Sequence, residues 1–389
     1  MKSTLEKASL LSLSLMMVST FAVSPALPSM IAHFERYGYN ASQIERLVPL
    51  SSFAIMAALL LSPIINRYLK ERAVIIIGLL LLSIGGSLPV FMPSYPVMFL
   101  SRILLGNGIG MLNARAINVI SERFTGKDRT RMLGLRGSME VLGSALLTFI
   151  AGQLLGISWS ASFAIYGFGL VVLVLYLAFV PDTPSSAQKP VAVLPKHATL
   201  SSKHLLYTLC IAFYAGFIIL VNSSVTIRIP QVVEQLGLGT ATQSSLLLSA
   251  MMIVGILAGA LYEPLMAVFG KFFQASISLV FALGCLVLWR ADSWLLLVLG
   301  ALATGFCYSL AVTYAFHTVS EKMPHHLVTT ATTMVLLGCN LGGGSTALAL
   351  QLLTHLAPGP TAVFGWYGLL LLSMTAVLML ALGYPPKRK

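Results

Sequence analysis

The chain has 389 residues, of which 57% are hydrophobic and only 9% are charged. Soluble domains carry about 25% charged residues, so this composition excludes a protein that covers itself with a water-facing surface. Apolar stretches of roughly 20 residues, long enough to cross about 30 Å of hydrocarbon, recur along the whole length. We therefore expect an all-α, polytopic membrane protein.

The basic residues are distributed as in a membrane protein with cytoplasmic ends. The net charge is +12, which by itself would suggest a nucleic-acid partner. However, the 24 Lys and Arg residues all lie on the side of the N-terminus, except Arg36, Arg46, Arg102, Arg228 and Arg290. Under the positive-inside rule, this asymmetry places both termini in the cytoplasm. The charge therefore predicts topology, and no nucleic-acid partner is expected.

The beginning of the chain imitates a secretory signal, because Lys2 and Lys7 precede an apolar run. This run continues to about Ile31, which favours a retained first span over a cleaved peptide. The cysteines lie within apolar runs and form no C-x-x-C pair; they are Cys210, Cys285, Cys307 and Cys339. Neither a disulfide framework, nor a metal site, nor a cofactor is expected from them.

The apolar runs predict twelve membrane-spanning helices, numbered here in chain order. They cover residues 9–31, 46–66, 73–92, 95–119, 132–156, 159–180, 204–227, 241–262, 270–291, 294–319, 326–354 and 361–382. The sixth and seventh spans are separated by residues 181–203, which are rich in Pro, Ser and Lys and have too little apolar surface to fold. We expect a cytoplasmic linker there, between a six-helix bundle at residues 1–180 and another at 204–389.

The two halves of the chain share a repeated sequence pattern. Ser101–Phe124, in span four, is matched about 200 positions later by Ala301–Met323, in span ten. Asn40-Ala41-Ser42-Gln43 before span two is matched by Thr240-Ala241-Thr242-Gln243 before span eight, each with a hydroxyl expected to cap the next helix. Self-similarity at one offset indicates a duplicated unit.

Six spans, a polar linker and six homologous spans resemble the major facilitator superfamily. Pro25 to Pro28 is similar to the P-x-L-P signature of its drug-efflux and arabinose-efflux branch, and Arg102 to Gly108 is similar to the R-x-x-x-G-x-G pattern of span four. The resemblance implies two six-helix bundles that rock about a pocket near the membrane midplane. The glycines of span four are expected to serve close helix packing.

The loop after span two resembles a degenerate form of the family motif G-x-L-x-D-R-x-G-R-R, with Asn66 in place of the aspartate. The resemblance implies a conformational latch formed by Asn66, Arg67 and Arg72, with Glu263 in the equivalent loop of the second half. Asn66 can form hydrogen bonds but no charged contact. Span five also lacks the G-P-x-x-G-G pattern typical of antiporters, which weakens the case for proton-coupled export.

Glu140 is the one acidic residue expected deep inside a span. A charged carboxyl in the bilayer core costs at least ~2.5 kcal/mol on insertion scales, so this residue is a functional candidate by default. Burial favours the neutral carboxyl and a neighbouring cation favours the charged one, and a group balanced between them can exchange protons near neutral pH. We therefore predict that Glu140 takes part in proton coupling.

Arg102 is predicted to act with Glu140 from the opposite side of the membrane. By helical rise they lie ~10 Å and ~12 Å below their own surfaces, and in a core of ~30 Å this leaves ~8 Å, which two long side chains nearly close. An equally weighted alternative is that both residues have only a structural role. In it, backbone carbonyls satisfy Arg102, and Glu140 pairs with Arg136 one helical turn away.

Spans one, four, seven and ten line the central cavity in the superfamily, so the resemblance implies candidates for substrate contact on these spans. They are Met17, Thr20, Phe21, Asn107, Asn113, Tyr214, Asn222, Cys307, Tyr308 and Tyr314. A lining that is apolar and aromatic, with a few amides and hydroxyls, suits an uncharged or amphipathic molecule. For each residue a lipid or helix contact is an equal alternative, and Tyr314 can instead belong to an inner gate with His317.

The expected function is proton-coupled efflux of lipophilic or amphipathic small molecules, and the alternative is proton-linked or facilitative uptake of a small polar metabolite such as a sugar. An enzyme is not expected, because the short loops contain no Ser-His-Asp, Cys-His or paired-carboxylate arrangement. The expected partners are a small-molecule substrate, protons and the lipid bilayer. We expect a monomer in the plasma membrane, which is the inner membrane in a Gram-negative cell.

Overall fold

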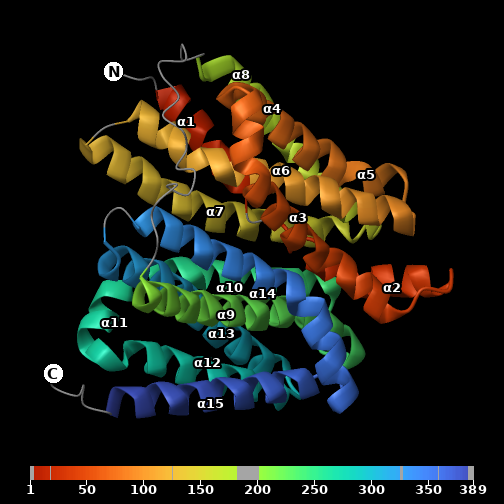
Figure 1. Ribbon diagram of the computed structural model, residues 1–389. Helices are drawn as coiled ribbons and strands as arrows, with labels where there is room; N and C mark the ends of the chain where they lie inside the picture. Colours follow the sequence, from red (N-terminus) through yellow and green to blue (C-terminus); the bar gives the residue numbers. More distant parts are fainter. Residues whose placement is uncertain are drawn as a thin grey trace. The chain divides into compact units, whose positions relative to one another are not determined.

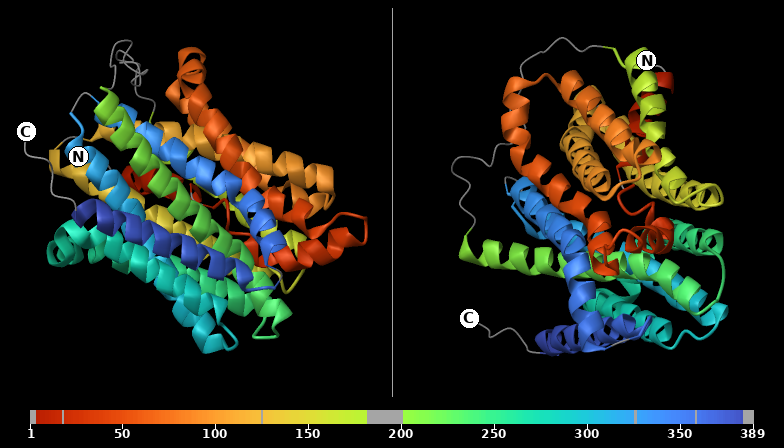
Figure 2. Two further views of the ribbon diagram at one scale, coloured as in Figure 1. Left: turned by 60° about the horizontal axis from the view of Figure 1, so that its bottom comes forward. Right: turned by 90° about the vertical axis from the view of Figure 1, so that its right-hand side faces the viewer.

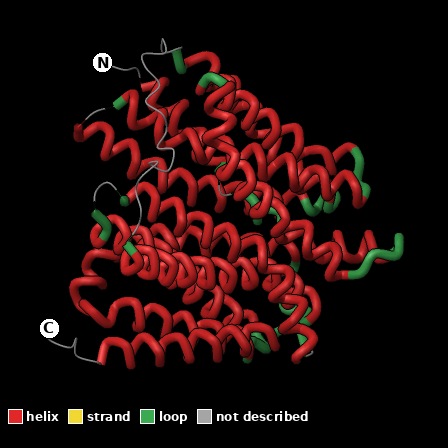
Figure 3. Tube along the Cα trace, viewed as in Figure 1, coloured by secondary structure: helices red, strands yellow, loops and turns green. Residues whose placement is uncertain are grey.

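The computed structural model describes residues 4–17, 19–124, 126–181, 201–324, 327–357 and 359–383. Almost all of these residues are helical, and none of them forms a β-strand (Figure 1, Figure 3). Within them, 11 helices are long and apolar enough to cross a membrane. The fold is therefore that of a polytopic all-α membrane protein, as the composition predicts.

The chain divides into two compact units, Met1–Thr199 and Leu200–Lys389. Residues 182–200, which make up most of the predicted linker, lie outside the described residues. The elements of the first unit are α1 (Thr4–Ser12), η1 (Leu13–Met16), η2 (Ser24–Ala26), α2 (Leu27–Glu35), α3 (Ala41–Tyr68), α4 (Glu71–Leu80), η3 (Leu81–Gly85), α5 (Gly86–Phe91), α6 (Tyr95–Arg123), α7 (Gly126–Leu154), η4 (Ser160–Gly167) and α8 (Phe168–Phe179).

The first predicted span differs from the continuous helix expected at residues 9–31. Figure 1 shows α1 and α2 as separate red helices, and residue 17 and residues 19–23 between them are not helical. Pro25 and Pro28 have no N–H to donate to a helical ladder. Serine hydroxyls bond to carbonyls three residues back instead: Ser19 to Met16 at 2.7 Å and Ser24 to Phe21 at 2.7 Å. This local competition interrupts the helix.

The alternating glycines of α6 allow this helix to approach two neighbours. A Cβ on Gly106 or Gly110 would lie 2.6 Å from the Cβ of Ala54 or Ala58 on α3. A Cβ on Gly108 would instead lie 2.6 Å from the backbone nitrogen of Leu82, in η3. The expected packing role of these glycines is therefore visible in the structure.

The second unit begins with α9, a helix of 34 residues. Its elements are α9 (Ser202–Gln235), α10 (Ala241–Ala260), α11 (Tyr262–Phe269), η5 (Gly270–Phe272), α12 (Phe273–Trp289), α13 (Trp294–Lys322), α14 (Val328–Leu356) and α15 (Ala362–Gly383). The counterpart of the first span, α9, is unbroken (Figure 2, green). It packs so closely on α14 that a Cβ on Gly342 would overlap the carbonyl of Gly216.

The repeated helix starts before α3 and α10 both form capping boxes. The side chain of Gln43 accepts from the backbone N–H of Asn40, and Gln243 does the same for Thr240. The reciprocal cap is a hydroxyl only in the second copy. In the first copy the amide oxygen of Asn40 accepts from the N–H of Gln43 at 2.9 Å. The two starts are therefore equivalent in geometry although their cap chemistry differs.

Candidate functional site

Arg102, on α6, is completely buried, with 0% of its surface exposed. Its Nη1 donates to the hydroxyl of Tyr166 at 3.3 Å and its Nη2 to the hydroxyl of Ser101 at 3.4 Å. The guanidinium carbon also lies 4.8 Å from the ring centre of Phe163 and 5.2 Å from that of Tyr166. Among the described residues no carboxylate forms an ion pair with it, so rings and hydroxyls stabilise this charge.

Glu140, on α7, forms an ion pair with Arg136, whose Nη2 lies 2.5 Å from Oε1 of the carboxylate. The Arg136 side chain is 15% exposed and the Glu140 side chain is 21% exposed. This is the pair that the structural alternative predicts. The same alternative assigned backbone carbonyls to Arg102, whereas the structure gives it hydroxyls and aromatic rings. Whether Glu140 carries protons stays a prediction.

Two arginines are linked to the interruption in the first span, Arg102 through Tyr166 and Arg136 directly. The hydroxyl of Tyr166, which accepts from Arg102, donates to the carbonyl of Ser19 at 3.0 Å. Nη2 of Arg136 donates to the sulfur of Met17 at 3.5 Å. The Cα atoms of Met17 and Ser19 are at most ~7.6 Å apart, since two trans peptides separate them. Two separate charged groups are therefore linked to one short non-helical segment.

The residues proposed to line a cavity lie on the predicted spans of each unit. Met17, Thr20, Tyr214 and Cys307 are buried within their own bundle. The others, partly exposed there, are Phe21, Asn107, Asn113, Asn222, Tyr308 and Tyr314. Asn107 uses its amide on its own helix, where Nδ2 donates to the carbonyl of Ile103 at 2.9 Å. Their contact with a substrate stays a prediction.

Tyr314 lies in an aromatic and charged cluster near the end of α13. Its ring centre is 5.8 Å from that of Phe273, and the ring of His317, one turn further, is 5.5 Å from that of Tyr262. Nδ1 of His317 lies 3.9 Å from a carboxylate oxygen of Glu321. Both roles of Tyr314, in an inner gate with His317 and in contact with a substrate, stay predictions.

The family of this chain follows from comparison with known proteins. The model of the Major Facilitator Superfamily matches residues 9–347. The chain belongs to this superfamily. No curated protein sequence matches it.

Solved structures of other transporters share the fold of this superfamily member at low sequence identity. A D-xylose–proton symporter is 16% identical with a TM-score of 0.74, covering 96% of this chain and 96% of the symporter. The POT family transporter PepTSo is 11% identical with a TM-score of 0.75, covering 98% of both chains. A nucleoside transporter, NupG, is 13% identical with a TM-score of 0.68, covering 97% of this chain and 98% of its own. Such similarity establishes the fold.

The loop motif of this facilitator leaves an unsatisfied amide. Both the nitrogen and the oxygen of the Asn66 side chain are buried without a hydrogen-bond partner among the described residues. Arg67 and Glu263 are exposed, and Arg72 is partly buried with interactions of its own. Buried polar groups are normally paired, so Asn66 is the member of the proposed latch that still requires a partner.

The sequence patterns do not indicate the buried ion pair at the end of α6. Nη1 of Arg123 lies 3.1 Å from a carboxylate oxygen of Glu6, with 6% and 9% of the side chains exposed. Nη2 of Arg123 also donates to the carbonyl of Pro181 at 2.9 Å. In this facilitator the pair ties α1 to the ends of α6 and α8. The one feature of the sequence that could have indicated this pair is Arg123, a basic residue within the repeated segment of span four.

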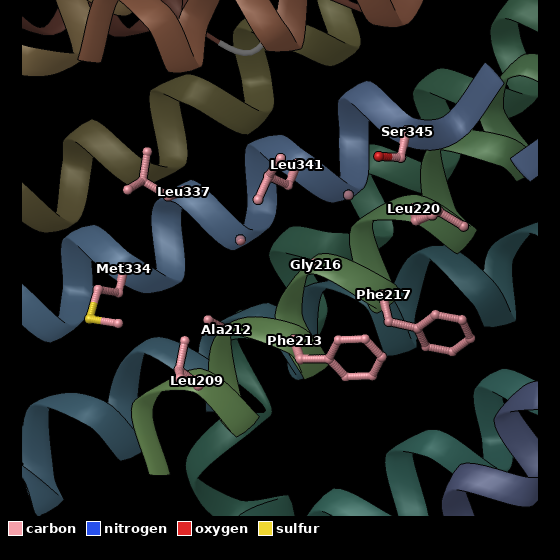
Figure 4. A pocket seen from close by; sticks show the side chains of 12 residues that line it. Leu209, Ala212, Phe213, Gly216, Phe217, Leu220, Met334, Leu337, Leu341 and Ser345 are labelled. Carbon is pink, nitrogen blue, oxygen red and sulfur yellow. The ribbon is translucent and has the colours of Figure 1, made fainter. Parts of the chain in front are cut away.

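The second unit has an apolar groove between α9 and α14, with a volume of about 470 Å³ (Figure 4). Leu209, Phe213 and Phe217 line it from α9, and Met334 and Leu341 from α14. The sequence indicated only the glycines under this groove, because its shape depends on how the two helices cross. Among the described residues, no group of three His, Cys, Asp or Glu side chains is placed to hold a metal ion.

Proposed function

We propose that this protein exports lipophilic or amphipathic small molecules in exchange for protons, as a member of the drug-efflux and arabinose-efflux branch. The observation that carries this proposal is the Glu140–Arg136 ion pair beside Met17 of the interrupted first span. About 200 positions later, the equivalent residues are Cys339 and Val335. The first half therefore holds a titratable pair at a position where the second half has Val335 and Cys339, which suits a proton carrier.

The proposed cargo follows from the side chains offered on spans one, four, seven and ten. These are mostly apolar and aromatic, with amides at Asn107, Asn113 and Asn222 and no carboxylate. A site of this kind holds its ligand mainly by burial, with a few polar contacts fixing orientation. Arg102 is proposed to act in coupling with Glu140 by holding the first span, and the conformational latch is formed by Asn66, Arg67, Arg72 and Glu263.

The proposed setting is the plasma membrane, with a monomer whose termini are both cytoplasmic. The bundles at residues 1–180 and 204–389 are proposed to move as two bodies joined by the linker at 181–203. The distribution of Lys and Arg supports this orientation.

Ethidium transport in everted membrane vesicles tests this proposal. When the interior is acidified, vesicles containing the full chain are expected to accumulate ethidium, and collapse of the pH gradient is expected to release it. Vesicles without the protein serve as the control. Equal accumulation in both preparations, or accumulation that is indifferent to the gradient, contradicts proton-coupled export of such compounds.

Uptake of a small polar metabolite is the second candidate. It is favoured by Gly143 and Ser144 of α7, which stand where antiporters carry the G-P-x-x-G-G pattern. Counterflow in proteoliposomes with a panel of sugars and dyes separates the two functions. Exchange of a sugar without exchange of any dye supports uptake.

A further inference from the structure

The interruption of the first span has no counterpart in the second half. Between η1 and η2, residue 17 and residues 19–23 leave the helical ladder, whereas α9 runs unbroken from Ser202 to Gln235. In membrane proteins, non-helical backbone at this depth occurs only where it is buried in protein or lines a cavity. In transporters such discontinuities accompany ligand sites. The interruption is therefore a candidate for a moving part.

The pieces on either side of the interruption both contact α7, and the outer piece makes a further contact of its own. On the inner side, α7 has Gly143 where any Cβ would overlap the backbone of Leu15, so α7 and η1 are in direct backbone contact. On the outer side, the rings of His33 and Phe34 lie 5.1 and 5.5 Å from that of Trp159. The inner piece is thus held by backbone contact with α7 and the outer piece also by aromatic contact with Trp159, and the interruption joins them.

Tyr166 supplies a tertiary hydrogen bond to the interruption itself. This side chain, in η4, is 0% exposed, and its hydroxyl donates to the carbonyl of Ser19 at 3.0 Å. Arg102 donates to the same hydroxyl at 3.3 Å, which leaves the tyrosine proton directed to Ser19. Because Arg102 has no carboxylate partner among the described residues, its charge strengthens this arrangement and no internal ion pair competes for it.

The second half offers a matched comparison. Tyr367, about 200 positions after Tyr166, is also buried, and its hydroxyl lies 2.7 Å from that of Ser224 on α9. There, however, the contact is made to a side chain on an unbroken helix, and Ser224 also donates to the carbonyl of Leu220 at 2.8 Å. Ala301 occupies the position equivalent to Arg102. The tyrosine is thus repeated, but its link to a broken span is not.

We propose that Tyr166 is a positioning residue for transport. Its hydroxyl, held by Arg102, acts with the backbone N–H of Ala22 to hold the carbonyl of Ser19, and with it the directions of Thr20 and Phe21, which follow in the chain. Release of this hydrogen bond lets the outer piece, residues 24–35, turn relative to α1 about the interruption. This last step rests on the proposed function, in which Thr20 and Phe21 contact the cargo.

Deuterium exchange tests the positioning role without any knowledge of the cargo. The parent protein, Tyr166→Phe and Tyr367→Phe are purified as full chains, and exchange is followed in peptides covering residues 13–26 and 218–230. In Tyr166→Phe we expect about five-fold faster exchange in the 13–26 peptide, the factor for loss of one net hydrogen bond. In Tyr367→Phe we expect no change in the 218–230 peptide, because the helical ladder remains.

Unchanged exchange at residues 13–26, or equal acceleration throughout the chain, overturns the proposal. If Tyr166→Phe does not fold, Arg102→Gln takes its place, since it removes the donor that orients the hydroxyl. Faster exchange confined to residues 13–26 is again expected, and unchanged exchange there again contradicts the role of Tyr166.

Ethidium transport kinetics then separate positioning from mere structural support. Tyr166→Phe is expected to raise KM several-fold with a smaller change in Vmax, because cargo contacts are misplaced. Tyr367→Phe is expected to leave KM unchanged. A lower Vmax at constant KM in Tyr166→Phe contradicts positioning. A parent protein that does not move ethidium contradicts the proposed function, while the exchange measurement still tests Tyr166.

Discussion

Arg102 and Glu140 show how a membrane-embedded charge is stabilised in two different ways. Arg102 is surrounded by the rings of Phe163 and Tyr166 and by hydroxyls, whereas Glu140 lies 2.5 Å from a cation on its own helix. Removing one partner of a buried ion pair leaves the other charge uncompensated, whereas removing both can be neutral. Single and double variants of the Glu140–Arg136 pair therefore separate its structural and functional roles.

We predict that Glu140→Gln loses proton-driven transport by a factor of about 5 to 150, the usual range of coupling between two sites, and that its transport no longer depends on pH. Exchange of cargo without a gradient is expected to persist. Adding Arg136→Gln is expected to restore thermal stability but not coupling. The comparison variant is Glu321→Gln, which removes the exposed partner of His317. Retention of the parent pH profile in Glu140→Gln excludes Glu140 as the proton carrier.

The Glu6–Arg123 pair allows a prediction on stability. Its side chains are 9% and 6% exposed, so Glu6→Gln is expected to destabilise the first unit by about 3–5 kcal/mol. The neighbouring Lys7–Asp128 pair is exposed, and Asp128→Asn is expected to change stability by no more than about 1 kcal/mol. Thermal unfolding of the purified variants measures both. Similar melting temperatures for the two variants would show that burial does not strengthen the Glu6–Arg123 contact.

At the scale of helices, glycine positions determine which spans can touch. Gly216 and Gly342 bring the backbones of α9 and α14 together, and a Cβ on Gly338 would lie 2.5 Å from the carbonyl of Ala212. Gly259, also within a helix of this unit, has open space where a Cβ would be. The same substitution at the two kinds of position should therefore have opposite effects.

Gly342→Ala is predicted to destabilise the second unit by about 1–3 kcal/mol or more, because the added methyl forces α9 and α14 apart. Gly259→Ala is predicted to be neutral or to stabilise by up to about 1 kcal/mol, from helix propensity alone. Thermal unfolding followed by tryptophan fluorescence compares the two variants. If Gly342→Ala has the same melting temperature as the parent, α9 and α14 can separate without loss of stability and their crossing is not tightly packed.

At the scale of the whole molecule, the distribution of charge predicts an orientation that can be measured. Protease-cleavable tags at the two termini are expected to be cut only in everted vesicles, because both ends are predicted to be cytoplasmic. In right-side-out vesicles both tags are expected to survive. Cleavage of one tag in each preparation would place the termini on opposite faces and exclude a duplicated six-helix arrangement.

The sequence alone determined the class of protein and its repeated plan. Mean hydropathy over roughly 20 residues is a local property, so membrane-spanning segments can be recognised without knowledge of their neighbours. The duplication is likewise visible as an offset within the chain. The unusual depth of Glu140 and its pairing with Arg136 follow from position and spacing along one helix. All of these depend on residues close together in sequence, or on simple repetition.

Tertiary structure decided the contacts of Arg102, the interruption of the first span and the groove between α9 and α14. Hydropathy marks residues 9–31 as apolar, but it does not distinguish a continuous helix from one whose carbonyls are bonded by serine hydroxyls. Tyr166 lies 64 positions from Arg102 and 147 from Ser19, and no local pattern links them. These features depend on which distant side chains meet in the folded bundle, and therefore they required the structure.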